Sequence, residues 1–211
     1  MKHHLTTLEL PLIPILRGIN PSEAVAIGNV LHGAGLRVLE VPLNSPAPFE
    51  SLSLLQRAFP DCLIGAGTVL TAAHVLACRD AGADLIVAPN FDVAVVSAAR
   101  NAGLQVLPGV ATPSEALSAF KAGASALKIF PAESVTAKVL RAGMAALPTD
   151  IKCFAVGGID GGNMAQFLRA GAFGFGIGSA LYRAGDSAEQ VSAKLGPLLS
   201  AWHAAHSRHQ T

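Results

Sequence analysis

One lysine, Lys128, lies inside the apolar stretch 126–131, where a surface lysine is not expected. An ammonium group surrounded by apolar side chains loses hydration, so its pKa falls and a neutral, nucleophilic amine forms near neutral pH. Such an amine can attack a carbonyl group and form a Schiff base. The alternative is that Lys128 lies at a strand end and extends its stem until the charge reaches water or a carboxylate.

The elements that would position Lys128 are marked by an Ala-Gly pair that recurs along the chain. Its glycines are Gly35, Gly82, Gly103, Gly123 and Gly171, and a β-rich apolar run follows each pair. This pattern is typical of a helix that ends in a left-handed glycine and leads into a strand. The glycine spacing corresponds to one or two strand-helix units, which predicts a parallel sheet with alternating helices.

Eight apolar segments are the candidate strands, namely 12–16, 38–42, 63–67, 85–88, 105–108, 126–130, 153–156 and 174–177. Helix starts agree, because Asn20 and Thr112 each precede a proline and then a glutamate, and Thr71 and Ser187 can cap two more helices. We therefore predict an α/β fold, a single (β/α)8 TIM barrel over residues 1–211 with short flexible N- and C-terminal tails. An open doubly wound sheet is disfavoured, because no Gly-x-Gly-x-x-Gly follows the first strand.

Composition and charge limit the classes of partner and the cellular compartment that we expect. The chain is 51% hydrophobic and 14% charged, with a net charge of +1 and no basic run, so no nucleic-acid partner is expected. The apolar runs are short and interrupted, which excludes a membrane-spanning helix of about 20 residues. The N-terminus does not read as a secretory signal, so we expect a cytoplasmic protein.

Cysteines and histidines give no indication of a metal. Cys62, Cys78 and Cys153 are far apart and each adjoins an apolar segment, so we interpret them as buried structural residues. The terminal histidines are interpreted as solvated and not metal-bound. These are His3, His4, His203, His206 and His209.

Side-chain alternation along the strands predicts a second charged residue in the barrel interior beside Lys128. Leu127 and Ile129 suit the helix-facing side of their strand, so Lys128 should point into the barrel. By the same reasoning Leu39 faces the helices and Glu40 points inward. Glu40 and Lys128 could form only a buried ion pair, but a carboxylate beside an amine is also what imine chemistry needs for proton transfer. Both lie near strand ends, where barrels carry their active sites.

Three further features surround this pair. Arg17 ends the first strand and suits a carboxylate or phosphate, or it pairs with Glu40. The glycines 157–158 and 176–178 follow the last two strands, where barrels bind phosphate, although they could instead relieve crowding. The segment 65–68 could offer amide and hydroxyl donors to a small carboxylate, or Thr68 could serve only as a cap or in a turn.

The chain resembles the class I 2-keto-3-deoxy-6-phosphogluconate aldolase family. The resemblance runs from about residue 12 to residue 183 and includes the Glu40, Gly-Ala-Gly-Thr and Lys-Ile-Phe-Pro elements in order. Its segments are 17–19, 40–46, 65–69, 88–90, 128–131 and 154–158. Phosphogluconate-specific members usually carry arginine in place of Asn44, threonine in place of Val156, and no arginine that matches Arg17. These departures point to the branch that cleaves the phosphogalactonate epimer.

The resemblance implies a TIM barrel and a Schiff-base mechanism. Lys128 would attack the C2 ketone of 2-dehydro-3-deoxy-6-phospho-D-galactonate, and Glu40 would move protons through a water. The products would be pyruvate and D-glyceraldehyde 3-phosphate, with no metal or organic cofactor and in a homotrimer. The implied substrate-binding residues are Arg17 and Thr68 at the carboxylate, Pro89 and Phe130 along the slot, Val156 beside C4, and Gly157, Gly158, Gly178 and Ser179 at the phosphate.

Other functions remain compatible with these residues. An aldolase could prefer 2-keto-3-deoxy-6-phosphogluconate or 4-hydroxy-2-ketoglutarate. A phosphosugar epimerase or isomerase could use Lys128 as a general acid, and a noncatalytic phosphosugar-binding barrel would need neither inward charge.

Overall fold

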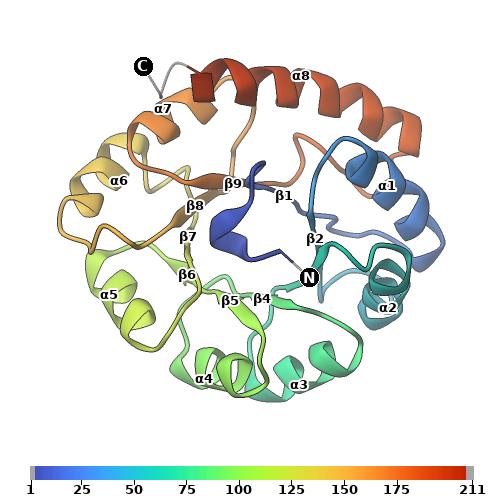
Figure 1. Ribbon diagram of the computed structural model, residues 1–211, viewed down its shortest axis with the longest axis horizontal. Coiled ribbons are helices and arrows are strands. Elements are labelled where there is room, and N and C mark those ends of the chain that lie inside the picture. Colours follow the sequence, from blue (N-terminus) through green and yellow to red (C-terminus); the bar gives the residue numbers. More distant parts are fainter. Residues whose placement is uncertain (1–2, 208–211) are drawn as a thin grey trace.

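The computed structural model describes residues 3–207, and within them a ring of parallel strands is surrounded by helices (Figure 1). The strands are β1 (Leu12–Pro14), β2 (Val38–Pro42), β3 (Leu63–Gly67), β4 (Leu85–Val87), β5 (Gln105–Leu107), β6 (Gly109–Val110), β7 (Leu127–Ile129), β8 (Cys153–Val156) and β9 (Gly174–Ile177). The helices are α1 (Pro21–Gly33), α2 (Pro48–Ala58), α3 (Ala72–Asp80), α4 (Val93–Asn101), α5 (Pro113–Lys121), α6 (Ala137–Met144), α7 (Met164–Arg169) and α8 (Ala188–Ser207).

The ring closes through two sheets, in the orders β1-β9-β8-β7-β6 and β2-β3-β4-β5. A bridge between Ile15 and Glu40 joins the first sheet to the second on one side. On the other side β5 and β6 are consecutive pieces of one barrel strand, separated only by Pro108, which has no N–H to give to a ladder. The nine segments are therefore the eight strands of the predicted (β/α)8 barrel, which is confirmed.

Sequence patterns located the strands closely. The observed bounds of β2, β3, β8 and β9 coincide with the predicted ones, and the other barrel strands are shorter or divided. The first strand shows why, because β1 ends at Pro14 and Ile15 continues only as a single bridge to β2.

Predicted helix boundaries are also confirmed. Thr71 Oγ1 accepts the His74 N–H at 3.2 Å, and Ser187 Oγ accepts the Gln190 N–H at 3.3 Å. The five Ala-Gly glycines all adopt positive φ, between 74° and 103°. Caps that we did not predict are Asp92 before α4 and Thr136 before α6, whereas Ala47 precedes α2 with φ 38° and no capping side chain.

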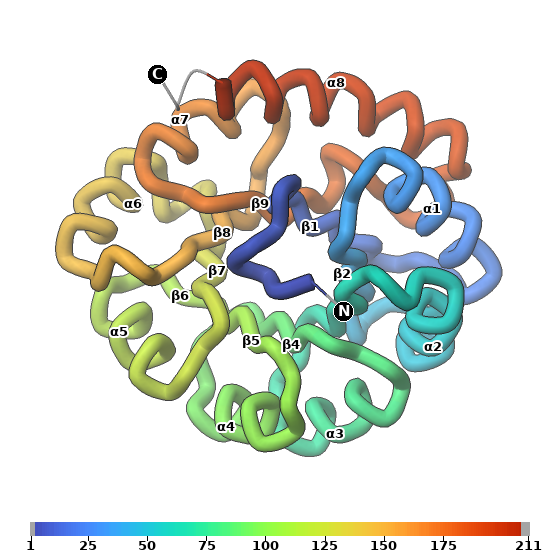
Figure 2. The backbone as a smooth tube through the Cα atoms, in the orientation of Figure 1, coloured from blue at the N-terminus to red at the C-terminus, as the bar shows by residue number. Residues whose placement is uncertain are grey.

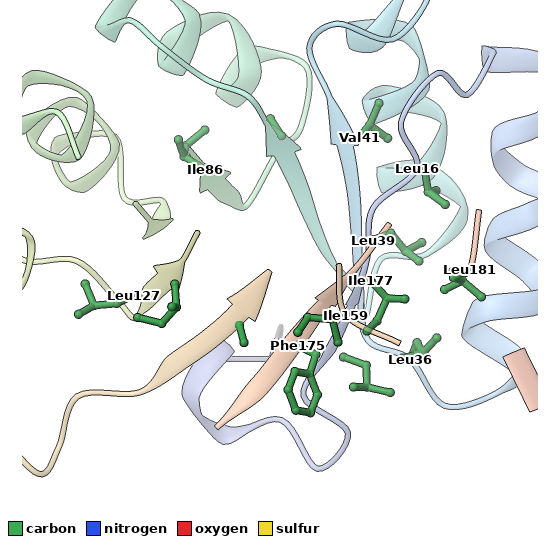
Figure 3. Packing of buried hydrophobic residues seen from close by; sticks show 14 of the residues in the cluster. Leu16, Leu36, Leu39, Val41, Ile86, Leu127, Ile159, Phe175, Ile177 and Leu181 are labelled. Atoms are coloured by element: carbon green, nitrogen blue, oxygen red, sulfur yellow. The ribbon is translucent and has the colours of Figure 1, made fainter. Parts of the chain in front are cut away.

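Two apolar layers follow from strand alternation. Leu39, Val41 and Leu127 pack with the helices in the larger cluster (Figure 3), as their parity predicted. The smaller cluster fills the barrel interior and contains Val38, Ala126, Phe154 and Val156, among others. Glu40 and Lys128 lie two residues after Val38 and Ala126 of this cluster, so strand alternation turns them to the same inward face.

The N-terminal segment closes one end of the barrel. A 3-10 turn, η1 (Leu5–Thr7), lies across the ring in Figure 2, and Leu5 is fully buried in the interior cluster. The Leu5 N–H donates to Gln105 Oε1 at 2.7 Å. We expected a flexible tail here, but an apolar Leu5 and Leu8 favour burial over exposure. The outermost residues of both expected tails, including His209, lie outside the described residues.

The cysteines also match expectation. Cys62, Cys78 and Cys153 are free and buried, and burial raises the pKa of their thiols to about 11, about 12 and about 12 respectively. His206, which we expected to be solvated, is instead half-buried, because its ring stacks on Trp202 with ring centroids 5.1 Å apart. Among residues 3–207, no helix combines the length and apolarity needed to cross a membrane.

Candidate active site

Lys128 lies on β7 with its side chain inside the barrel. It is 6% exposed, and its Nζ lies 4.4 Å from the centroid of the Phe130 ring. Burial lowers the pKa of Lys128 below its usual value, the Glu40 carboxylate opposes this shift, and Arg17 adds to it. A lysine held this way offers a neutral amine at lower pH than a surface lysine does.

Glu40 lies on β2 and is 3% exposed. Burial raises the pKa of its carboxyl, while the charges of Lys128 and Arg17 act in the opposite direction. Among the ion pairs of the described residues, none within 4.0 Å joins Glu40 to either cation. The two inward charges are therefore coupled through space without being locked to one another.

Gly67 makes room for the carboxylate of Glu40. A Cβ at Gly67 would overlap Oε1 of Glu40, and a Cβ at Gly65 would touch Glu40 at its Cα and Cβ, 3.6 Å away. We expected these glycines to offer amides to a ligand, and the structure gives Gly67 a steric role toward Glu40. Thr68 follows with φ 58°, a left-handed conformation that costs on the order of 1 kcal/mol outside glycine. This left-handed conformation directs the half-buried Thr68 side chain at the end of β3.

Arg17 lies at the exposed strand-end rim. Its Nη1 donates to Asn44 Oδ1 at 2.8 Å. The next residue is held as well, because the Gly18 N–H donates to Ser45 Oγ at 2.9 Å. Arg17 thus pairs with Asn44 and not with Glu40, which corrects the simpler alternative of an Arg17–Glu40 pair.

Pro89, Phe130 and Val156 lie at three further strand ends. Val156 is buried in the interior cluster, and Phe130 packs against that cluster. Pro89 follows β4 and is half-buried, and Gly109 lies so close to its carbonyl that a Cβ there would overlap it. Phe130 and Val156 therefore lie on the inward side of the barrel, and Pro89 lies at the carboxyl end of β4.

A cavity of about 270 Å³ lies beyond β8 and β9. It is lined by Gly157, Gly158, Ile159, Asp160, Gly176, Gly178, Ser179, Ala180 and Arg183. All four residues that we predicted for phosphate line it, whereas Lys128 and Glu40 do not. Val156 connects the two regions, because a Cβ at Gly176 would lie 2.7 Å from Val156 Cγ2.

The glycine pair in this cavity has a conformation that needs glycine. Gly157 has φ 104° and Gly158 has φ 63°. Glu133 packs against the same pair, since a Cβ at Gly158 would lie 2.6 Å from Glu133 Cγ. Side chains at either position would therefore be strained and would meet Glu133.

Asn163 holds the loop after β8. Its Nδ2 donates to the Gly158 carbonyl at 2.7 Å, and its Oδ1 accepts the Asp160 N–H at 3.0 Å. Asp160 Oδ1 in turn accepts the N–H groups of Gly162 and Asn163, at 2.8 and 3.1 Å. These bonds fix the direction of the Gly158 carbonyl and with it the peptide groups that line the cavity.

Sequence reasoning missed Asn163 and Arg183. Arg183 lines the glycine cavity, yet its neighbours in sequence form no recognised binding motif. A signal was present, because Arg183 follows the last strand by six residues and so lies at the end of the barrel where ligands bind.

One group of metal-ligand types occurs among the described residues, away from this site. His32, Asp61 and Cys62 have ligand atoms within 4.8 Å of one another. However, His32 Nε2 already lies 2.9 Å from Asp61 Oδ2, and Arg37 Nε lies 3.4 Å from the same oxygen. A guanidinium at the shared oxygen disfavours a cation there, so we interpret the group as an ion-pair cluster.

A cavity of about 260 Å³ also lies between α5 and α6, outside the barrel. Its lining is mainly apolar and includes Ile129, Val139 and Met144. It contains no titratable side chain, so it offers no acid, base or nucleophile.

Comparison with known proteins agrees with this geometry. The profile described as "Aldolase: KDPG and KHG aldolase" matches residues 4–194. The chain is 44% identical to a probable 2-dehydro-3-deoxy-6-phosphogalactonate aldolase of Rhizobium meliloti (strain 1021), over 98% of each chain. It is 45% identical to the 2-dehydro-3-deoxy-6-phosphogalactonate aldolase of Escherichia coli (strain K12), over 93% of this chain and 97% of the relative.

A solved structure described as "Native KDPGal structure" superposes with a TM-score of 0.93 at 43% identity. The superposition covers 98% of this chain and all of the other. Profile, relatives and structure agree over nearly the whole length, so the chain belongs to the KDPG and KHG aldolase family.

Proposed function

We propose that this chain is a class I aldolase that cleaves 2-dehydro-3-deoxy-6-phospho-D-galactonate to pyruvate and D-glyceraldehyde 3-phosphate. The observation that carries the proposal is the buried Lys128, on the same inward face as Glu40 and with a lowered pKa. An amine of this kind is the nucleophile that a Schiff-base mechanism requires.

The reaction begins when the neutral Nζ of Lys128 attacks C2 of the keto acid. Loss of water from the resulting carbinolamine gives an iminium ion. A base removes the proton of the C4 hydroxyl, the bond from C3 to C4 breaks, and its electrons enter the iminium to form an enamine. Glyceraldehyde 3-phosphate leaves as the aldehyde. Protonation of the enamine at C3 and hydrolysis of the imine release pyruvate and restore Lys128.

Glu40 is the group that moves protons in these steps, directly or through a water. Burial raises the pKa of its carboxyl, which brings it closer to the range where one group can serve as both acid and base. Arg17 and Thr68 would bind the carboxylate of the substrate, and Phe130 and Pro89 would flank the slot. Gly157, Gly158, Gly178 and Ser179 would bind the phosphate.

The galacto epimer is proposed on two grounds. The two relatives at 44% and 45% identity bear the phosphogalactonate name. In the structure, Val156 lies buried in the barrel interior beside the glycine cavity, and a valine offers no hydroxyl to a substrate. A site without that donor gives no added hydrogen bond to the gluco epimer.

The setting of the enzyme is also proposed. Residues 1–211 would form one domain that works in the cytoplasm, in galactonate catabolism, and that assembles as a homotrimer. Family resemblance supports the trimer. Its small-molecule partners would be the phosphorylated sugar acid, pyruvate and glyceraldehyde 3-phosphate.

Reductive trapping tests the reaction class. Borohydride added with pyruvate should attach a stable mass to Lys128, located by peptide mass spectrometry, and Lys128→Ala should abolish it. An epimerase, or a noncatalytic binding protein, would give no adduct.

Cleavage of both 6-phosphate epimers, compared as kcat/KM, tests the substrate, and a preference for the gluco compound would overturn the epimer assignment.

A further inference from the structure

The glycine cavity has one lining residue with a positive charge, Arg183. The expected phosphate residues Gly157, Gly158, Gly178 and Ser179 offer only neutral donors to an anion. Neutral amides and a hydroxyl do not by themselves distinguish a dianion from a less charged group. A guanidinium at the same cavity adds that discrimination, because hydrogen bonds to charged groups are about twice as strong as neutral ones.

The backbone holds Arg183 firmly at the cavity rim. The N–H groups of Leu181 and Tyr182 donate to the Gly178 carbonyl at 2.9 and 3.0 Å, which forms a turn directly after β9. The Arg183 N–H then donates to Asp186 Oδ2 at 2.7 Å. These bonds fix the Cα of Arg183 relative to Gly178, although its side chain is exposed.

The acids near Arg183 are occupied by other partners. Asp186 Oδ2 forms its ion pair with Lys194 Nζ, and the charge of Arg183 is the smallest of the effects that lower the pKa of Asp186. Asp160 also lines the cavity, but its Oδ1 accepts two N–H groups of the loop before α7. Glu133 packs against Gly157 and Gly158 from a second cavity, which Arg183 does not line. Among the described residues no ion pair uses the Arg183 guanidinium.

The loop that carries Arg183 also lies against the loop that carries Arg17. Gly18 packs on Ala184 so closely that a Cβ at Gly18 would lie 2.9 Å from the Ala184 Cβ. Each arginine is the direct neighbour of one of these two contacting residues. The two loops therefore bring two cations to one side of the barrel mouth.

We propose that Arg183 is a specificity-determining residue that binds the phosphate of the substrate and favours phosphorylated over unphosphorylated sugar acids. This inference rests on the proposed function and extends it by one residue. Arg17 would hold the carboxylate at C1 and Arg183 the phosphate at C6, and Lys128 of β7 would reach C2 from the barrel interior. A substrate with an anion at each end suits this arrangement.

The test compares Arg183→Gln with the wild type on two substrates. For the 6-phosphate we expect KM to rise roughly tenfold with kcat changed less than about twofold, as for loss of one charge-assisted contact. For the unphosphorylated 2-dehydro-3-deoxy-galactonate we expect kcat/KM to stay the same. Inorganic phosphate should inhibit the wild type competitively, and its inhibition constant should rise by a similar factor in the variant.

Three controls separate the possible outcomes. Arg57→Gln removes an exposed arginine of α2 and should leave both substrates unaffected. Arg183→Lys should restore part of the affinity. Trapping of pyruvate on Lys128 should be the same in Arg183→Gln as in the wild type, because pyruvate has no phosphate.

An equal loss on both substrates, or an unchanged KM for the phosphorylated one, would overturn the role of Arg183. Absence of a trapped imine in the wild type would instead refute the proposed aldolase reaction. The two failures are therefore distinguishable.

Discussion

Arg17 and Asn44 form a hydrogen-bonded pair, with Nη1 of the arginine 2.8 Å from Oδ1 of the asparagine. They belong to the loops after β1 and β2, and 26 residues of chain separate them. The family resemblance singled out the same two positions as departures from phosphogluconate-specific members. In the structure these two departures act together. The Asn44 side chain directs Arg17, an arginine that has no counterpart in phosphogluconate-specific members.

This pair predicts a measurable coupling. Asn44→Ala should raise KM for the cleaved sugar acid about two- to fivefold with little change in kcat, because the guanidinium loses the acceptor that directs it. In a cycle with Arg17→Gln, the second change should add less than its single effect. The coupling energy should be about 0.5 to 1 kcal/mol, since both side chains are exposed. Strictly additive effects would show that Asn44 does not position Arg17.

The charges around Lys128 predict the pH dependence of imine formation. Only the neutral amine attacks, so the rate falls as pH drops through the pKa of Lys128. The Glu40 carboxylate raises this pKa, so Glu40→Gln should move the acid limb to lower pH. Arg17 lowers it, so Arg17→Gln should move the limb to higher pH. The pH profile of pyruvate trapping measures both shifts.

A matched control for this experiment is Glu50→Gln, on the exposed first turn of α2. Its profile should coincide with that of the wild type. Shifts in the same direction for Glu40→Gln and Arg17→Gln would contradict an electrostatic origin. Glu40→Gln should also slow turnover, because its amide cannot carry the proton.

Gly67 predicts a steric effect on catalysis. Gly67→Ala should displace the Glu40 carboxylate, destabilise the fold by about 1 to 3 kcal/mol and reduce turnover strongly. Gly143→Ala is the control, because no atom lies within 4 Å of a Cβ there and α6 should gain roughly 0.5 to 1 kcal/mol. Denaturant unfolding and cleavage kinetics measure the two effects. Full activity in Gly67→Ala would show that the position of Glu40 does not matter.

Val156 predicts the choice between epimers. Val156→Thr keeps the volume in the barrel interior and adds a hydroxyl beside the proposed site. We expect kcat/KM for the gluco epimer to rise about fivefold relative to the galacto epimer, the effect of one neutral hydrogen bond. The ratio of the two specificity constants measures it, and Val156→Ala controls for shape. An unchanged ratio in Val156→Thr would remove Val156 from the specificity argument.

Local sequence patterns located the elements of this protein because their causes are local. Each Ala-Gly pair marked a helix end, since glycine accepts the positive φ that stops a helix. Alternation along β7 was enough to turn Lys128 inward, because successive side chains of a strand point to opposite faces. The effect of Pro108 was not predicted, because the split of one barrel strand into β5 and β6 became visible only in the structure.

The relationships between distant segments were decided by the tertiary structure. Gly67 suggested an amide donor in the sequence, yet its neighbour in space is Glu40, which comes from another strand. Arg183 carried no motif, and its place at the glycine cavity follows from loops that meet only when the barrel closes. Leu5 was expected to lie in a flexible tail, but in the structure it is buried at the open end of the barrel. Sequence alone determined which residues could react and which way their strands turn them, because side-chain alternation is a short-range property. Which residues meet across the barrel depends on contacts between segments far apart in the chain.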